Sequence, residues 1–424
     1  MKSVITCDME GVIETFNPGA EEMFGYDKEE LIGKKRVSLF SPGEIVLQNV
    51  GTWLSEAMKS GEYVTETQFI RKDGERFNAR IRITMTYKDG KDQPPTGYCG
   101  VTEKLDKPVE VPIHWSTHLI KALAITRMPF LSAVLGPGFV AGAFAAHYTL
   151  TEGAFSWSLF LITLLGLALL HLASNVFNDY FDVKDGTDGA NTAYFTQFTG
   201  GSRAIELGLI DLKGTKRLAI ALLAAAMLIG LYLTWQTGWP TLAIGLAGAF
   251  MGYFYTAPPL RLVARRGLGE LTIVLAFGCM VTLGTYYVLT GELSWLAFLI
   301  GLPPGLLTAN ILLINEFPDA ESDALTGKDH LIVAYGKKAG VYFYLIILLL
   351  AIASYGVIFS LLGSDNYFIL AVGAFTAIYG LLIFNKIRKD YQKRELVKSN
   401  VNTIILSSVS SILFAIALLL PGWI

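Results

Sequence analysis

The stretch SWSLFLITLLGLALLHLASNVFNDYFD, residues 156–182, predicts the architecture of this chain most directly. Its first part is an apolar run long enough to cross a membrane, for which about 20 residues are needed. Its last part places Asn175, Asn178, Asp179 and Asp182 three or four residues apart, so these side chains share one face of a helix. The stretch predicts a membrane helix that ends in a polar face.

The composition of the whole chain supports a membrane protein. The 424 residues are 52% hydrophobic and 17% charged, with a mean hydropathy of +0.46, whereas soluble domains carry about 25% charged residues. The formal net charge of −2 argues against a nucleic-acid-binding protein. Cys7, Cys99 and Cys279 are too few and too scattered for a disulfide scaffold or a cysteine-rich zinc site.

Apolar runs predict an all-α bundle of nine transmembrane helices in residues 128–420. The expected spans are 128–150, 156–178, 217–236, 240–257, 270–290, 294–314, 341–362, 366–385 and 402–420. Residues 107–127 are expected to form a linker and an amphipathic helix at the membrane interface, with Trp115 and Leu119 on its apolar face.

The basic residues predict the orientation of the bundle. Of the 34 Lys and Arg residues, 17 follow residue 127. All of these fall in the four long loops or, for Arg217, directly at the end of one, and none falls in the short turns. We expect the protein to lie in the cell (inner) membrane. The positive-inside rule then places the long loops in the cytoplasm and the C-terminus outside. The start MKSVITCDMEG has no apolar signal segment, so we expect residues 1–106 to be cytoplasmic too.

Residues 1–106 predict a separate α/β domain with an antiparallel sheet. Apolar and polar side chains alternate over 76–87, after a turn at Lys72-Asp73-Gly74 and another strand at 65–71. Together with DMEGVIETFNPGAEEMFGYDKEELIGK and GYCGVTEKLD, this region resembles a PAS domain. Because it has no histidine, and Cys7 and Cys99 lack the Asn-Cys-Arg context of flavin light sensors, we expect no PAS cofactor. The resemblance implies a regulatory module, or one that forms a homodimer or binds a regulatory partner.

A second polar motif follows the sixth expected span. Asn315, Asp319 and Asp323 are spaced four residues apart, so they also share one helix face, on the same side of the membrane as the first motif. Two facing carboxylate clusters repel each other unless cations join them. Oxygen ligands of this kind suit Mg²⁺, which shares its shell with phosphates. The predicted diphosphate-binding cations are Lys184, Arg203, Arg261 and Lys328.

The paired motifs resemble those of the UbiA superfamily of intramembrane aromatic prenyltransferases, over residues 112–420. NDYFDVKDGTD, TGGSRAIELGLI, YTAPPLRL and NEFPDAESDALTGKDHLIVAYGKK are most similar to the 1,4-dihydroxy-2-naphthoate branch, which serves menaquinone synthesis. Glu316, Ala334 and Tyr335 depart from that branch, which bears on the acceptor rather than on the reaction. The resemblance implies Mg²⁺-dependent transfer of a polyprenyl group from polyprenyl diphosphate to an aromatic acceptor.

The resemblance also implies roles for single residues. Catalysis is assigned to Asp179, Asp182, Asp319 and Asp323. The expected Mg²⁺ ligands are these four with Asn175, Asn178, Asp188 and Asn315, and the choice between Asp185 and Asp188 stays open. His171, Tyr180 and Tyr255 are candidates for a pocket that holds the acceptor or an allyl cation, although packing explains such residues more often.

Other functions stay open at this point. The acceptor could be 4-hydroxybenzoate, homogentisate, a chlorophyllide or a glycerol-linked lipid. A non-catalytic membrane anchor for a PAS sensor is a second alternative. A transporter is disfavoured because the carboxylates gather at one rim, whereas transporter sites lie near the midplane of the bilayer.

Overall fold

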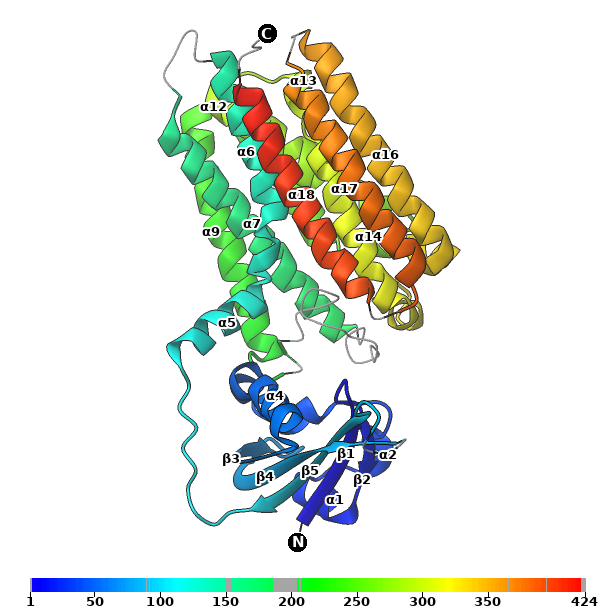
Figure 1. Ribbon diagram of the computed structural model, residues 1–424. Helices are drawn as coiled ribbons and strands as arrows, with labels where there is room; N and C mark the ends of the chain where they lie inside the picture. Colours follow the sequence, from blue (N-terminus) through cyan, green and yellow to red (C-terminus); the bar gives the residue numbers. More distant parts are fainter. Residues whose placement is uncertain are drawn as a thin grey trace. The chain divides into compact units, whose positions relative to one another are not determined.

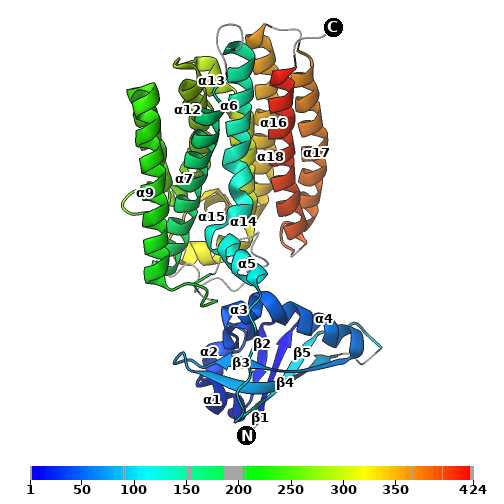
Figure 2. The same ribbon diagram turned by 90° about the vertical axis from the view of Figure 1, so that its left-hand side faces the viewer.

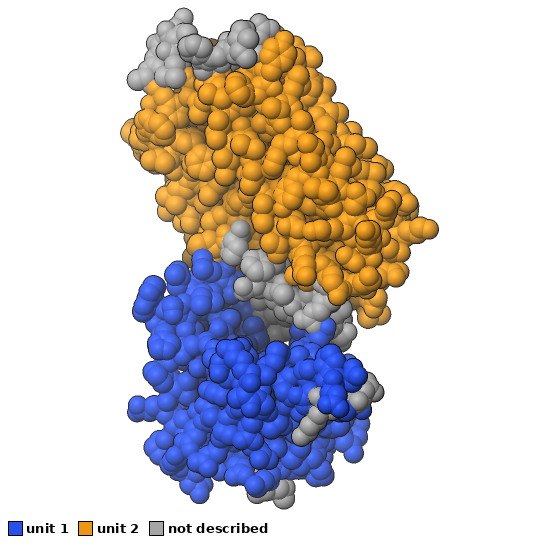
Figure 3. All heavy atoms as spheres, viewed as in Figure 1, with its two compact units in different colours: residues 1–125, 203–211 blue, residues 126–202, 212–424 orange. Residues whose placement is uncertain are grey.

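The computed structural model describes residues 2–88, 90, 92–149, 155–185, 204–205, 207–363, 366–393 and 395–420. The chain divides into two compact units, shown in Figure 3. Unit 1 comprises Met1–Ile125 together with Arg203–Asp211, and unit 2 comprises Thr126–Ser202 and Leu212–Ile424.

Unit 1 is built on a five-stranded antiparallel sheet with the strand order β2-β1-β5-β4-β3. The strands are β1 (Lys2–Asp8), β2 (Ile13–Phe16), β3 (Glu62–Ile70), β4 (Arg76–Thr86) and β5 (Gly97–Lys104). The predicted hairpin joins β3 to β4, with Gly74 in the left-handed region at φ 89°. Ala79 and Ile83 are buried while Arg80 and Arg82 are exposed, so the predicted alternation along β4 is confirmed.

Helices pack on this sheet around an aromatic core. In α1 (Pro18–Phe24), the Asn17 side chain accepts a hydrogen bond from the Ala20 amide and so caps the N-terminus. Phe24 of α1 contacts the rings of Phe40 and Phe69, and Trp53 of α4 (Gly51–Ser60) belongs to a second buried cluster with Ile83 and Tyr98. Unit 1 therefore has a hydrophobic core of its own.

Unit 2 is a bundle of long helices, which run side by side in Figures 1 and 2. Among the described residues, seven segments have the length and composition of membrane spans. They are α7 (Trp157–Lys184), α9 (Leu212–Thr237), α11 to α12 (Leu268–Thr290), α13 to α14 (Trp295–Leu325), α16 (Lys337–Leu362), α17 (Phe368–Asp390) and α18 (Leu396–Leu419). The chain is a multi-pass membrane protein.

The two remaining predicted spans correspond to shorter apolar helices, α6 (Ser132–Thr149) and α10 (Trp239–Phe254). At 1.5 Å per residue, the 16 residues of α10 extend about 24 Å, less than the roughly 30 Å of hydrocarbon in a bilayer. The structure thus supports seven spans by length and composition, and nine remains a prediction.

Two of the spans are not continuous α-helices, because the first contains a π-helical stretch and the second is interrupted at Ile300 and Gly301. The first consists of α11 (Leu268–Ile273), the π-helical η5 (Val274–Cys279) and α12 (Met280–Thr290), and the second of α13 (Trp295–Leu299) and α14 (Leu302–Leu325). They meet at a glycine seam formed by Gly278, Gly301 and Gly305, where a Cβ at Gly278 would collide with the Gly301 carbonyl oxygen and lie 2.7 Å from Gly305 Cα. The absence of side chains lets the two backbones touch.

The motif helices extend beyond the predicted membrane segments. Helix α7 continues to Lys184, past the predicted end at 178, and α14 continues to Leu325, past 314. Both polar motifs therefore lie on regular helix, as their spacing predicts. The expected interfacial helix corresponds to α5 (Trp115–Thr126), where Trp115 is 78% and Leu119 50% exposed.

Candidate active site

The two polar motifs face a common cavity in unit 2. Its volume is about 200 Å³. Six of the predicted Mg²⁺ ligands line it, Asn175, Asn178 and Asp182 from α7 and Asn315, Asp319 and Asp323 from α14. The structure thus brings together side chains that lie more than 130 positions apart in the chain. We call this space the polar cavity.

Lys328 joins the two motifs. Its Nζ lies 2.6 Å from Asp182 Oδ1 and 3.7 Å from Asp323 Oδ1, and all three side chains are about 90% buried. The backbone N–H of Lys328 donates to the Asp323 carbonyl, 2.9 Å away, so the turn after α14 fixes the lysine. One cationic group therefore reaches carboxylates from both helices.

Asp179 is held by a residue outside the predicted set. Its Oδ1 accepts a hydrogen bond from Arg127 Nη2 at 2.6 Å, and both side chains are largely buried. Arg127 also lines the polar cavity, and its backbone has a φ of 51°, a conformation that non-glycine residues rarely adopt. One signal in the sequence could have indicated Arg127, because it is a single basic residue at the start of the first apolar run.

Glu316 and His330 also line the polar cavity, although neither was predicted to act there. His330 Nε2 lies 3.1 Å from Asp323 Oδ2, and its Nδ1 lies 3.2 Å from Glu316 Oε2. Burial lowers the pKa of His330, but the hydrogen bond with Asp323 and the nearby Glu316 carboxylate outweigh it and raise the pKa to about 10. The imidazolium therefore adds a second buried positive charge beside the α14 carboxylates.

The other predicted cations are placed differently. Arg261 Nη2 lies 3.1 Å from Asp185 Oδ2, while Lys184 is exposed at the end of α7. Arg203 and Asp188 fall outside the described residues. The predicted cations that the structure describes therefore lie in two places, Lys328 inside the polar cavity and Arg261 and Lys184 at the end of α7.

Of the three aromatic candidates, two face the polar cavity. His171 and Tyr255 line it, and His171 Nε2 lies 3.0 Å from Asn175 Nδ2. Tyr180 packs instead in an apolar cluster with Val176, Phe177 and Phe181. The reason is helix geometry, because Tyr180 is five residues after Asn175 and thus about 140° around the helix from it.

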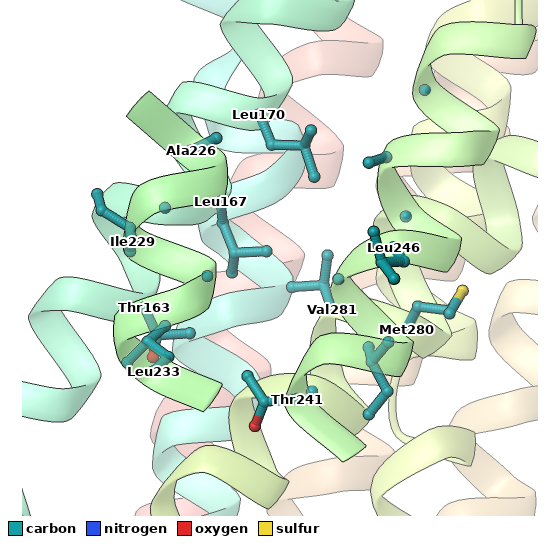
Figure 4. Close-up of a pocket in the computed structure, with 18 of the residues that line it drawn as sticks. Thr163, Leu167, Leu170, Ala226, Ile229, Leu233, Thr241, Leu246, Met280 and Val281 are labelled. Atoms are coloured by element: carbon teal, nitrogen blue, oxygen red, sulfur yellow. The ribbon is translucent and has the colours of Figure 1, made fainter. Parts of the chain in front are cut away.

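An apolar cavity of about 560 Å³ adjoins the polar cavity. Its walls come from α7, α9, α10, η5 and α12, and Figure 4 shows Ile229 and Leu233 of α9 across the space from Leu246 of α10. Five residues line both cavities, namely His171, Ser174, Gly252, Ala276 and Phe277. The two spaces therefore meet at this point.

The donor set of the polar cavity fits a divalent cation. Carboxylate and amide oxygens from both motifs are ligands that Mg²⁺ prefers, and Asp182 and Asp323 already reach one cationic group. Among the described residues, however, no three Asp, Glu, His or Cys side chains converge as a ready metal site. Instead Arg127, Lys328 and His330 neutralise these carboxylates.

The PAS-like unit encloses a cavity of about 80 Å³, lined among others by Cys7, Phe24 and Trp53. This is well below the roughly 300–1,000 Å³ of ordinary ligand pockets. Burial raises the pKa of the Cys7 thiol to about 12, so the thiol stays protonated near neutral pH. Operation without a cofactor stays a prediction, and the size of the cavity supports it.

The UbiA prenyltransferase family matches residues 134–409, more than half of the chain. The chain belongs to the UbiA prenyltransferase family. Residues 2–97 match the PAS domain family. Both predicted resemblances are thereby confirmed, and the chain is a UbiA-family membrane protein with an N-terminal PAS domain.

Curated relatives of this UbiA chain include naphthoate prenyltransferases. The 1,4-dihydroxy-2-naphthoate octaprenyltransferase of Bacillus subtilis is 30% identical over 217 residues, which cover 51% of this chain and 66% of that protein. The 2-carboxy-1,4-naphthoquinone phytyltransferase of Synechocystis is 30% identical over 219 residues, 51% of this chain and 67% of that protein. The chain thus spans about two thirds of the length of these relatives.

A solved structure shares the UbiA fold. The UbiA homolog from Archaeoglobus fulgidus bound to GPP and Mg²⁺ has a TM-score of 0.51 and 18% identity, and the match covers 70% of this chain and 99% of that one. At this identity the likeness shows the fold alone.

Proposed function

We propose that this UbiA-family protein transfers a polyprenyl group from polyprenyl diphosphate to an aromatic acceptor, 1,4-dihydroxy-2-naphthoate, in menaquinone synthesis. The observation that carries the proposal is the polar cavity, where the α7 and α14 motifs meet around Lys328. The printed names of the naphthoate prenyltransferase relatives support the choice of acceptor.

Mg²⁺ would be held by Asp182, Asp319 and Asp323, with Asn175, Asn178 and Asn315 as further oxygen ligands. When bound, Mg²⁺ neutralises the diphosphate and assists its departure. Asp179 and Asp188 remain predicted ligands, and Asp179 would have to exchange its contact with Arg127 for one with metal.

The chain's own residues supply the rest of the mechanism. Lys328, Arg127 and Arg261 bind diphosphate oxygens, joined by Lys184 and Arg203, and hold the departing group. The bond between the allylic carbon and the diphosphate oxygen breaks, and the diphosphate leaves with the electron pair. A ring carbon of the acceptor bonds to the allylic carbon and loses its carboxylate as CO₂. Apolar walls beside His171, Tyr255 and Phe277 exclude water from this step.

The proposal includes the number of membrane spans and the side of the membrane on which the loops lie. We place α6 and α10 across the bilayer with the seven longer segments, which gives nine spans and puts the long loops and the PAS domain in the cytoplasm. The short helices fit if flanking residues or local thinning of the bilayer make up the missing length.

An assay of the purified protein in detergent tests the proposed reaction. With Mg²⁺, a polyprenyl diphosphate and a panel of acceptors that includes 1,4-dihydroxy-2-naphthoate, we expect demethylmenaquinol and CO₂. The quinol is detected by mass, directly or as demethylmenaquinone after oxidation by air. Removal of a residue that only supports a metal ligand typically lowers activity about 10–100-fold. Asp323→Asn removes a proposed ligand itself, so it should reduce turnover by more than this. Asp390→Asn is the matched control, because Asp390 pairs with Lys393 at the end of α17. Absence of product with every acceptor, from folded wild-type protein, would refute the proposal.

We infer that the PAS domain regulates this activity through the segment that precedes α9. Arg203–Asp211 belongs to the same compact unit as the PAS domain, although it lies between α7 and α9 in the chain. Leu209 is 4% exposed, and a Cβ on Gly43 of α3 (Gly43–Ile45) would lie 2.6 Å from its Cδ2 and collide with the Leu207 carbonyl oxygen. Arg203, a predicted diphosphate-binding residue, is the first residue of this segment.

Two glycine variants in the PAS domain test this coupling in the full chain. Gly43→Val should displace Leu207 and Leu209 and change the KM for polyprenyl diphosphate by about threefold or more, which corresponds to roughly 0.7 kcal/mol. Gly51→Val is the control, since a Cβ there meets nothing within 4 Å. Regulation of the transferase by the PAS domain would be contradicted by two results together. These are equal kinetics for both variants and the wild type, and unchanged activity on deletion of residues 1–106 under all redox conditions tried.

A further inference from the structure

We infer that two glycines, Gly230 and Gly245, set the length of the polyprenyl chain that the apolar cavity accepts. The inference rests on the proposed function, because it assigns the apolar cavity to the tail of the diphosphate substrate. Three observations carry it: the join between the two cavities, the composition of the apolar cavity, and the surroundings of its glycines.

The join between the cavities determines the kind of occupant. His171, Ser174, Gly252, Ala276 and Phe277 line both spaces. A ligand that lies across this join has a charged end beside Lys328 and an apolar remainder beside α9 and α10. A polyprenyl diphosphate has this division, with its allylic carbon next to the charged end.

The apolar cavity suits a long chain without polar groups. Its volume of about 560 Å³ lies within the roughly 300–1,000 Å³ of ligand pockets, and leucine, isoleucine, valine, methionine and phenylalanine dominate its walls. Figure 4 shows Leu167 and Leu170 of α7 directed into the space.

The glycines along the apolar cavity are of two kinds. At Gly166 and Gly284, a Cβ would lie 2.9 Å from Ile229 and 3.1 Å from Ile244, so these glycines permit close packing between helices. At Gly230 and Gly245, a Cβ would meet nothing within 4 Å. Both of these lie inside helices, where glycine is less favourable than alanine, so the backbone does not require them. What they provide is open space.

Their position determines which part of the substrate uses that space. Gly245 lies seven residues before Gly252, the position on α10 where the two cavities join. Seven residues are about two turns, or roughly 10 Å along the helix. A side chain at 245 would therefore leave room for the first isoprene units next to the join and block the passage of later ones.

The test compares short and long substrates on full-length variants. For Gly245→Phe we expect kcat/KM for octaprenyl diphosphate to fall about tenfold or more, which is a loss of about 1.4 kcal/mol. The value for geranyl diphosphate should stay within about twofold of the wild type, because its chain ends before the block. Gly230→Phe, on the opposite wall, should give the same pattern and serves if the first variant does not fold. Gly356→Phe is the matched control, because a Cβ at Gly356 of α16 also meets nothing within 4 Å and this residue lies outside the cavity lining.

A binding measurement separates this inference from the proposed reaction. Thermal stabilisation of the protein by each diphosphate, without acceptor, needs no turnover. If the wild type makes no product but octaprenyl diphosphate stabilises it and fails to stabilise Gly245→Phe, the proposed reaction fails and the tail assignment stands. Equal losses with both substrates, or no loss with either, would overturn the assignment. Loss of a co-purified phospholipid from Gly245→Phe, with an unchanged substrate profile, would also overturn it and identify a lipid acyl chain as the occupant.

Discussion

Lys328 is the residue on which the geometry of the polar cavity depends most. Its ammonium group reaches Asp182 of α7 and Asp323 of α14, so it neutralises like charges that two helices bring together. His330 contributes a second positive charge against Asp323, and Arg127 a third against Asp179. The arrangement shows how this membrane protein keeps several carboxylates buried at one end of a bundle.

Replacement of Lys328 by methionine tests this role. The variant keeps the length of the side chain but leaves two buried carboxylates without their shared cation, which typically costs about 3–5 kcal/mol. We expect a clear fall in the thermal unfolding temperature in detergent. Lys337→Met is the control, since its partner Glu321 is 86% exposed and such pairs contribute about 1 kcal/mol or less. A Lys328 variant as stable as the Lys337 variant would contradict the role.

At the level of residues, sequence spacing predicted the motifs better than their partners. Asn175, Asn178 and Asp182 face the polar cavity with Asn315, Asp319 and Asp323, as helical periodicity requires. The contacts of Asp179 with Arg127 and of Glu316 with His330 could not be predicted, because spacing along one helix does not specify which side chain arrives from elsewhere. Whether these residues bind metal and diphosphate stays a prediction.

At the level of helices, the unequal burial of the spans is the main feature. In the most apolar 18-residue stretch of the α13 to α14 segment, 72% of the residues are buried within the protein. The corresponding share for α9 is 17%, and this helix lies at an edge of the bundle in Figures 1 and 2. The two most buried spans meet at the glycine seam of Gly278, Gly301 and Gly305. The seam fixes α14, and with it the second polar motif, against η5.

The glycine seam predicts sensitivity to a single methyl group. In Gly278→Ala, the new Cβ would meet backbone atoms of Gly301 and Gly305, which cannot turn aside as a side chain could. We expect a loss of about 1–3 kcal/mol in stability, seen as a lower thermal unfolding temperature in detergent. Gly356→Ala is the control and should be neutral or slightly stabilising, because its Cβ has open space in a helix. A stable Gly278→Ala protein would show that the helices separate easily here.

Hydropathy located the helices but not their internal breaks. The predicted spans at 270–290 and 294–314 correspond to segments with a π-helical stretch at 274–279 and an interruption at Ile300 and Gly301. Hydropathy depends on composition, which these changes leave untouched. Helix ends were also missed, because polar motifs end a hydropathy span while the hydrogen-bonded helix continues to Lys184 and Leu325.

At the level of the whole molecule, the chain combines two units that have separate cores. The PAS unit buries Phe24, Phe40 and Phe69 around its sheet, and the bundle buries Tyr344 and Tyr355 among its helices. The sequence indicated this division through its change in charge and hydropathy. It did not indicate that Arg203–Asp211 joins the first unit, because that contact links positions about 160 residues apart.

Separate cores predict two unfolding transitions in the full chain. Replacement of the detergent by one with a shorter chain should lower the transition of the bundle and leave that of the PAS unit unchanged, because only the bundle is solvated by detergent. Far-ultraviolet circular dichroism during heating measures both, and Phe24→Ala, which should cost about 3–5 kcal/mol, identifies the PAS transition. A single transition that moves as a whole with detergent would indicate that the two units unfold together.

The glycine seam also has a consequence for genetics. Under the proposed function, a library of random mutants scored only for loss of the prenylated product would recover substitutions at Gly278, Gly301 and Gly305 as readily as substitutions at Asp182 or Asp323. The first group would fail because too little intact protein accumulates, and the second because intact protein does not turn over substrate. Counting protein molecules in the membrane beside each phenotype would therefore sort structural from chemical defects, without any purification.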